Sequence, residues 1–343
     1  MLNDAFTILP AFERNNVPVV IAANNLYAPY AGVFIQSLLD HAREERNYDV
    51  IIFQHDISEE NQRLIKRLSA GYTSVSIRFY DPSPFFSSIN YEDENHRFPI
   101  EVYYRIIAPY ILKHSGRIIT VDTDTLLKAD IARLMDEDLG EYSVGGVCDV
   151  GMNGMYLCDY TLYGKDVKIK DYFQNVCKLG SDGLKNYVNG GLLLIDRDKF
   201  VRELDIETIL SIARQGKYIY EEQDILNVSM KGRIKTLDFA WNVGVRSTPH
   251  SIRIFNAGAK LYDGAYERAY ENPYLIHWSA RPKPWICPDV PWGGDWWQTA
   301  LRTPFVGHII ARMMDGLETR RDYFRKRYGK EIDVWDPSPK GVD

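Results

Sequence analysis

The segment RIITVDTDTLL (residues 117–127) carries an apolar, β-branched run that leads directly into two aspartates. The run predicts a buried β-strand, with Asp122 and Asp124 at its carboxyl end. Because side chains alternate along a strand, both carboxylates should face one way and Thr123 the other. Two carboxylates this close repel each other unless a cation or hydrogen-bond donors hold them. The pair could be a metal site, a helix cap or ordinary charge at a strand end.

Strands and helices alternate on both sides of this segment. The expected strands lie at residues 17–24, 48–56, 74–81, 117–122, 142–151, 187–196 and 273–278. The expected helices lie at residues 29–42, 58–71, 98–116 with an internal proline, 131–140, 198–216, 221–232 and 295–328 with a break near Pro304. This alternation predicts an α/β fold with a mostly parallel central sheet flanked by helices. Ligands of such sheets bind at the carboxyl ends of the strands, where Asp122 and Asp124 lie.

Ser58, Asp130 and Asp196 each precede a predicted helix and are expected to cap it. Residues 151–185 are polar and aromatic without a clear period, and we expect them to cover the sheet as an irregular excursion. Residues 281–285 (RPKPW) form a stiff loop, and the last eight residues a frayed tail.

Composition narrows the class of protein. The net charge is −6, from 41 basic and 47 acidic residues, so the overall electrostatic field does not favour binding of nucleic acid. Four scattered cysteines without a CxxC pair predict buried thiols in a reducing compartment; they are Cys148, Cys158, Cys177 and Cys287. We find neither a signal peptide at the N-terminus nor an apolar stretch long enough to span a membrane. The expected location is therefore cytoplasmic.

Other readings of the aspartate pair can be tested by inspection. Two further DxD matches occur, Asp136–Asp138 in a charged helix and Asp196–Asp198 at a helix start. A calcium loop counted from Asp122 would need Gly and Glu where Leu127 and Arg133 stand. The sequence contains no GxxxxGK[ST], GxGxxG or GxSxG motif. Metal-dependent use of a phosphorylated ligand is what remains, with Mg²⁺ or Mn²⁺ as the ion.

The stretch IHWSARPKPW (residues 276–285) supplies two further candidates. His277 ends an apolar strand, and a neutral imidazole can be a third ligand for Mn²⁺. Lys283 lies between two prolines, where its ammonium could neutralise a diphosphate. The alternatives are a hydrogen-bonded histidine at a strand end and a surface lysine.

Several motifs, in order, resemble a known family. They are PVVIAANNLYAPYAGVFIQSLL, YYRIIAPYIL, IITVDTDTLL, YVNGGLLLID, EEQDILN, IHWSARPKPW and GGDWWQTALRTPF. Together they cover roughly residues 17 to 300 and are similar to family 8 retaining glycosyltransferases, in particular the bacterial lipopolysaccharide galactosyl- and glucosyltransferases. The resemblance implies the GT-A type nucleotide-sugar transferase fold. It places a catalytic domain at residues 1–290, with a nucleotide-binding half at about 17–125 and an acceptor half at about 126–290, and a helical C-terminal region at 291–343.

The resemblance also implies a site. Mn²⁺ (or Mg²⁺) would be bound by Asp122, Asp124 and His277 and would hold the diphosphate of a UDP-sugar. Donor-binding residues would be Ala22, Asn24 and Tyr27 around the base, Arg105, Asp149, Asn189, Glu222 and Gln223 along the sugar, and Ala280 and Lys283 near the phosphates. Thr123 also belongs to the donor-binding set. Arg105, Glu222 and Gln223 would be the catalytic set.

The chemistry of glycosyl transfer agrees with these residues. Negative charge develops on the departing diphosphate, and a divalent ion and a lysine stabilise it. Gln223 could face the oxocarbenium-like transition state through its carbonyl, but a neutral amide is a poor nucleophile. Attack by the acceptor hydroxyl on the leaving-group side would therefore explain retention. Three residues depart from the family pattern, namely Asn24 for Asp, Glu222 for Asp and Ala280 for Gly. The first leaves the identity of the base undetermined, and the second leaves the identity of the sugar undetermined.

The expected activity is transfer of glucose or galactose from a UDP-sugar to a glycan or lipid-linked glycan, with lipopolysaccharide core or another surface polysaccharide as acceptor. A self-glycosylating primer similar to glycogenin and a non-catalytic binding module on the same fold are the alternatives. Basic and aromatic residues at 318–330 suit either the inner surface of the membrane or a helix with a solvated basic end.

Overall fold

A seven-stranded sheet forms the centre of the computed structural model, which describes residues 7–89, 99–162 and 167–316. The strand order is β3-β2-β1-β4-β7-β6-β8. The strands are β1 (Asn16–Ala22), β2 (Asn47–Phe53), β3 (Val75–Tyr80), β4 (Arg117–Val121), β6 (Val144–Cys148), β7 (Val188–Asp196) and β8 (Ile234–Thr236). All neighbours pair in parallel except β7, which is antiparallel to both β4 and β6. The expected mostly parallel sheet is confirmed.

A second, three-stranded sheet decides where the predicted site residues meet. Its order is β5-β10-β9, built from β5 (Thr125–Leu127), β10 (Leu275–His277) and β9 (Val243–Gly244). The chain passes from β4 of the large sheet through Asp122 and Asp124 into β5 of the small one. His277 of β10 is paired with Thr125 of β5, so the two sheets meet at the aspartates.

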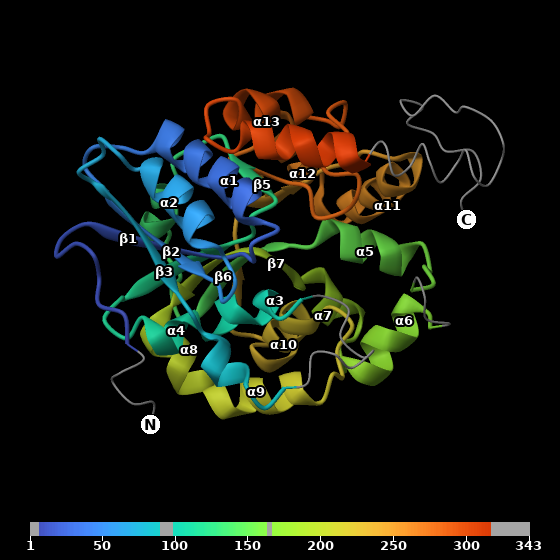
Figure 1. Cartoon of the computed structure of the whole chain (residues 1–343). Coiled ribbons are helices and arrows are strands. Elements are labelled where there is room, and N and C mark those ends of the chain that lie inside the picture. The colour runs from blue at the N-terminus through green and yellow to red at the C-terminus, as the bar shows by residue number, and fades with distance from the viewer. Residues whose placement is uncertain (1–6, 90–98, 163–166, 317–343) are drawn as a thin grey trace.

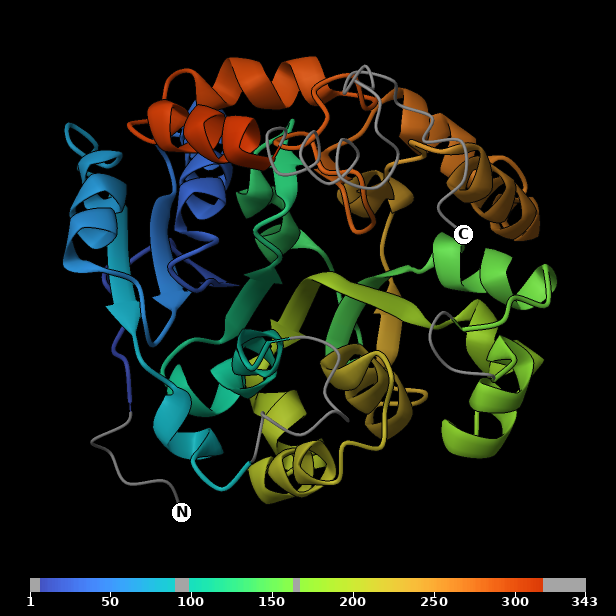
Figure 2. The same ribbon diagram turned by 45° about the vertical axis from the view of Figure 1, so that its right-hand side comes forward.

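Helices cover both faces of the large sheet (Figure 1). On one face α1 (Ala28–His41) lies beneath α13 (Gly293–Ala300), and its apolar residues are buried between that helix and the sheet. On the other face lie α4 (Ala108–Ile111), α8 (Arg197–Glu203), α9 (Ile206–Arg214) and α10 (Glu221–Ser229). In the view turned by 45°, α11 (Pro249–Ala259) and α12 (Ala265–Glu271) continue the layer of α13 (Figure 2).

The three predicted caps are confirmed. The Ser58 side chain accepts a hydrogen bond from the N–H of Asn61 at the start of α2 (Glu59–Arg67). Asp130 caps a 3₁₀ turn at Ile131–Asp136, where an α-helix to residue 140 was expected. Asp196 accepts from the N–H of Lys199 and so begins α8.

Two further expected helices differ from the structure. The segment 98–116 is divided into α3 (Glu101–Tyr104), a 3₁₀ turn (Arg105–Ile107) and α4. Pro109 lies in the first turn of α4, because proline has no N–H to continue a preceding helix. Residues 198–216 form two helices, since Asp205 caps α9.

The excursion expected at 151–185 is more regular than its sequence indicated. It contains α5 (Val150–Leu157), α6 (Ile169–Asp171), a π-helical turn (Tyr172–Val176) and α7 (Ser181–Lys185). Their apolar residues are buried against neighbouring elements rather than along one periodic stripe, which explains why periodicity missed them.

In the described part of the C-terminal region, α13 is followed by a helical run at 306–316 after a break that contains Pro304. The basic segment 318–330 and the tail lie outside the described residues. No helix in the described ranges combines the length and apolar character needed to cross a bilayer. All four cysteines are free thiols; Cys148 and Cys177 are buried, whereas Cys158 and Cys287 are partly exposed, contrary to expectation.

Close packing of α5 against α11 generates a first prediction. A Cβ atom on Gly154 would lie 1.9 Å from the carbonyl oxygen of Ile254, a backbone atom that cannot move aside alone. We expect Gly154→Ala to lower the free energy of unfolding by about 2 kcal/mol or more, as overpacking does. Denaturant unfolding measures this. Gly116→Ala is the control, because a Cβ there meets nothing within 4 Å; equal stability of the two variants would contradict the packing argument.

Candidate active site

The two aspartates and the predicted histidine lie together. Nε2 of His277 is 3.2 Å from Oδ1 of Asp124 and 3.6 Å from Oδ2 of Asp122. One ligand atom from each residue lies within 4.8 Å of the other two, a group that could hold a metal ion. Two carboxylates and an imidazole are ligands that suit Mn²⁺, and the carboxylates also suit Mg²⁺. The donor set therefore fits the expected divalent ion.

A chain of hydrogen bonds fixes which nitrogen of His277 faces the acids. The N–H of Gly191 donates to Oδ1 of Asn189 (2.9 Å), which also accepts from Nδ2 of Asn242 (2.9 Å). The amide of Asn242 therefore presents its oxygen to Nδ1 of His277, 2.9 Å away. Nδ1 must therefore carry a proton, which leaves Nε2, the nitrogen facing Asp122 and Asp124, as the one that can bind a metal when the imidazole is neutral. This arrangement is the one a metal-binding imidazole needs.

Two buried cations balance the carboxylates. Nη2 of Arg105 lies 2.5 Å from Oδ1 of Asp122, and Nζ of Lys283 lies 2.5 Å from Oδ2 of Asp124. Burial opposes ionisation of Asp124, but Lys283 and His277 outweigh it and lower the pKa of that carboxyl well below its usual range. Lys283 also donates to the carbonyl of Trp278. Its ammonium is therefore directed at the paired aspartates rather than into open solvent.

The residues expected along the sugar form one network. Nε2 of Gln223 donates to Oδ2 of Asp149 (3.2 Å), which also accepts from Nδ2 of Asn189 (3.0 Å). Oε1 of Gln223 accepts from the N–H of Gly190 (2.9 Å) and from Asn189 (3.2 Å). Arg105 links this network to the paired aspartates, since it donates to the carbonyl of Gly190 (3.0 Å) and also contacts Asp122.

Glu222 is an acid of this network whose pKa is raised. Its Oε1 lies 3.4 Å from Nη2 of Arg105. Burial raises the pKa of Glu222 to about 8, against the opposing charge of Arg105 and with a further contribution from Asp122. The carboxyl is therefore largely protonated at neutral pH and can donate as well as accept a hydrogen bond.

The residues expected around the base lie at the end of β1 and the start of α1. Oδ1 of Asn24 accepts from the N–H of Tyr27 (3.0 Å). The ring of Tyr27 meets Trp285 edge-on with centroids 6.2 Å apart, and Tyr30 stacks on the same indole. Burial raises the pKa of Tyr27, and the charge of Asp124 adds to that effect. Tyr27 is thus close enough to the carboxylates for its hydroxyl to be affected by them.

Three expected residues take less part in these contacts. Ala22 ends β1, and Thr123 is buried in the turn between the two aspartates. Ala280 lies in the exposed loop after β10.

The structure separates the three DxD segments by their contacts. Asp136 forms an ion pair with Arg46 at 2.7 Å, and Asp138 accepts from the N–H of Gly140. Asp196 is used as a helix cap. Among the described residues a second group with metal-binding side chains does occur, formed by His55, Asp56 and Glu101.

Sequence reasoning missed several residues of the site. Asn242 lies in a 3₁₀ turn (Phe239–Asn242) that no pattern predicted, and it orients His277. Tyr187 accepts a hydrogen bond from Gln223, and Asp224 follows Gln223 in the sequence. Both side chains are buried. The sequence signal available for them was only their position next to the YVNGG and EEQDILN motifs.

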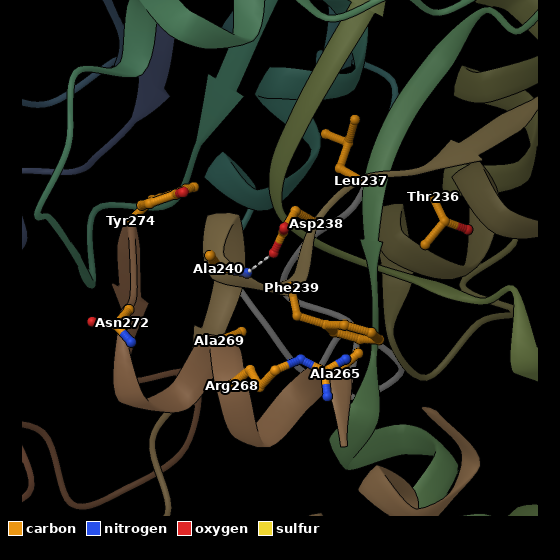
Figure 3. A pocket seen from close by; sticks show the side chains of 10 residues that line it. All are labelled: Thr236, Leu237, Asp238, Phe239, Ala240, Ala265, Arg268, Ala269, Asn272 and Tyr274. Atoms are coloured by element: carbon orange, nitrogen blue, oxygen red, sulfur yellow. Dashed lines mark hydrogen bonds between the residues drawn. The ribbon is translucent and has the colours of Figure 1, made fainter. Parts of the chain in front are cut away.

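A pocket of about 440 Å³ opens elsewhere, between the segment around Phe239 and helix α12 (Figure 3). Its polar groups serve the fold. Asp238 accepts from the N–H of Ala240, and Arg268 donates to the carbonyl of Asp263. Its lining includes neither the paired aspartates nor His277.

The raised pKa of Glu222 yields a prediction for the metal-free protein. The folded-state pKa of Glu222 is about 8, above the ordinary 4.5. The contribution of this carboxyl to the free energy of unfolding is therefore fully present below pH 4.5 and is lost as the pH rises through about 8. We expect Glu222→Gln to flatten the fall in the free energy of unfolding between pH 6 and 9. Urea unfolding across that range measures it. The exposed Glu207→Gln is the control; identical pH slopes for Glu222→Gln and wild type would refute the assignment.

Comparison with known proteins finds relatives that cover most of the chain. The chain is 23% identical over 273 residues to General stress protein A of Bacillus subtilis, covering 78% of this chain and 86% of that protein. It is 26% identical over 192 residues to lipopolysaccharide 1,2-glucosyltransferase of Escherichia coli, covering 54% and 48%.

Solved structures show the same fold. The bifunctional glycosyltransferase WbbM superposes with a TM-score of 0.74 at 24% identity, covering 90% of this chain and 53% of that one. The galactosyltransferase LgtC, solved with donor and acceptor sugar analogues, gives 0.63 at 21% identity, covering 84% and 96%. Both are glycosyltransferases of the expected fold class. The model of the family described as Glycosyl transferase family 8 matches residues 18–287, and the chain belongs to that family.

Proposed function

We propose that the protein is a retaining hexosyltransferase that moves glucose or galactose from a UDP-sugar to a glycan acceptor. One observation carries the proposal: the acids Asp122 and Asp124, the imidazole of His277 and two buried cations meet beside the Gln223 amide. A group of metal-binding side chains next to a network of polar side chains suits a ligand with a diphosphate at one end and a sugar at the other.

The metal ligands of the proposal are Asp122, Asp124 and His277. A bound Mn²⁺ or Mg²⁺ would counter the negative charge of the diphosphate as it leaves. Lys283 and Arg105, now paired with the two aspartates, would gain a second anionic partner when the donor binds. Ala280 and Thr123 would lie along the phosphates, and Ala22, Asn24 and Tyr27 around the base.

The proposed sugar-binding residues are those of the hydrogen-bond network that joins β7, α10, the N-terminus of α5 and Arg105. Asp149, Asn189 and Glu222 offer polar atoms toward sugar hydroxyls, and Arg105 holds Glu222. Gln223 would stabilise the developing positive charge through the dipole of its amide. Because that amide is neutral, we propose that the acceptor attacks from the side of the departing phosphate, which retains the configuration without a covalent intermediate.

The proposed acceptor is lipopolysaccharide core or another surface polysaccharide. Support comes from relatives named as lipopolysaccharide glucosyl- and galactosyltransferases, including a 1,3-galactosyltransferase of Salmonella typhimurium that is 20% identical over 279 residues. Such an acceptor would be met at the cytoplasmic face of the inner membrane. Contact of residues 318–330 with that surface is supported by their basic and aromatic side chains alone.

The central prediction concerns binding and turnover of the donor. We expect a UDP-hexose to raise the melting temperature only when Mn²⁺ or Mg²⁺ is present, because a ligand of the folded state stabilises it. Slow release of UDP should accompany binding. Asp124→Asn should abolish both effects while its amide oxygen still accepts from Lys283. Asp136→Ala, in another DxD segment, should leave both unchanged.

The outcomes of this experiment separate the proposal from its alternatives. If no UDP-sugar stabilises the protein in a metal-dependent way, the proposal is wrong. Covalent labelling of the protein by labelled donor without acceptor would instead indicate a self-glycosylating primer. Tight donor binding with no turnover on any acceptor would indicate a non-catalytic binding module.

The hydrogen bond from His277 to Asn242 gives a separate prediction. Asn242→Ala removes the acceptor for Nδ1, so the imidazole loses its fixed tautomer and orientation. We expect the affinity for Mn²⁺ to fall about 10–100-fold, which is typical for loss of such a supporting contact. Calorimetric titration of Mn²⁺ measures it. Asn256→Ala, which removes only the exposed contact with Arg246, is the control; unchanged affinity in Asn242→Ala would contradict the assigned tautomer.

A further inference from the structure

Asp224 is a buried carboxylate on which several donors converge. Its side chain is fully enclosed and accepts from the hydroxyl groups of Tyr172 and Tyr187, the latter at 2.6 Å. It also accepts from the N–H of Tyr220 (2.8 Å) and lies 3.9 Å from Sγ of Cys177. Burial raises the pKa of Asp224, although the hydrogen bonds from both tyrosines favour its ionised form. Four donors exceed what a cap at the start of a helix requires.

The carboxylate sets the direction of the next hydrogen bond. A tyrosine hydroxyl has one proton, and Tyr187 donates it to Asp224. The oxygen of Tyr187 can then only accept, and it accepts from Nε2 of Gln223 at 3.2 Å. Donation to a carboxylate also polarises the hydroxyl and makes its oxygen a better acceptor. Asp224 therefore acts on Gln223 through Tyr187, although Asp224 and Gln223 are neighbours in sequence.

Tyr187 completes the hydrogen bonding of the Gln223 amide. The second acceptor for Nε2 is Asp149, and Oε1 accepts from the N–H of Gly190 and from Asn189. With four partners the amide has no freedom to rotate; Asn189 and Gly190 lie in β7, Tyr187 directly before it, and Asp149 caps α5. Removal of the Tyr187 hydroxyl would leave one N–H of the partly buried Gln223 side chain without its acceptor.

We propose that Tyr187, directed by Asp224, is a positioning residue that holds the Gln223 amide in place in the active site. Its effect on catalysis rests on the proposed function, whereas its effect on the amide does not. The buried pair of Asp224 and Tyr187 thus has a role beyond stability, because it links the core to the polar side chain of Gln223.

The kinetic test compares two tyrosines that both donate to Asp224. Tyr187 and Tyr172 are equally buried, but only Tyr187 contacts Gln223. We expect Tyr187→Phe to lower kcat for UDP-hexose turnover about tenfold with KM within about twofold, as loss of one positioning hydrogen bond would. Tyr172→Phe should lower the melting temperature similarly and leave kcat within about twofold. Equal losses of kcat in both variants, or none in Tyr187→Phe, would overturn the proposal.

A second measurement needs no turnover. In the full-length protein with ¹⁵N-labelled glutamine, the side-chain amide signals of Gln223 can be assigned by their loss in Gln223→Asn. We expect Tyr187→Phe to shift these signals and Tyr172→Phe to leave them in place. Unshifted signals in Tyr187→Phe would refute the contact. If wild type turned over no UDP-sugar but the shift appeared, the proposed function would fail while the positioning of Gln223 by Tyr187 stood.

Discussion

The imidazole of His277 lies directly against the backbone of Gly191, and the active site depends on that close approach. A Cβ atom on Gly191 would lie 2.3 Å from Cε1 of the ring, so any side chain there would displace it. The same residue accepts from the N–H of Asp122 and donates to Asn189. One glycine of β7 therefore joins the large sheet, the small sheet and the polar network, and it allows the third metal-ligand candidate to reach the other two.

Backbone N–H groups can only donate, and they fix the direction of the side-chain hydrogen bonds around them. The N–H of Gly191 orients Asn189, which orients Asn242, which fixes the proton of His277. On the other side of β7 the N–H of Gly190 holds the oxygen of Gln223. A site built in this way is pre-organised, because little needs to move when ligand binds. The buried cations complete it by offsetting the repulsion between the paired aspartates.

Local sequence predicted much of this arrangement. The apolar run before Asp122 predicted β4, and the caps at Ser58, Asp130 and Asp196 followed from residue type at helix starts. Patterns failed where burial is not periodic. Helix α5 was missed because it packs through glycines against α11, and residues 98–116 were expected as one helix with an internal proline although they form α3, a 3₁₀ turn and α4. Periodicity reports one buried face, and these segments are buried on several.

The sequence by itself determined the alternating α/β architecture, the order of the motifs and the pair of carboxylates at a strand end, since each depends on residues close along the chain. Tertiary structure alone decided that His277, some 150 residues away, reaches those carboxylates, that Asn242 sets its tautomer, and that Asp224 acts on Gln223 through Tyr187. The contacts of His277 join the large sheet to the small one, and those of Tyr187 join the start of β7 to α10. They depend on packing of the whole core and on no local pattern.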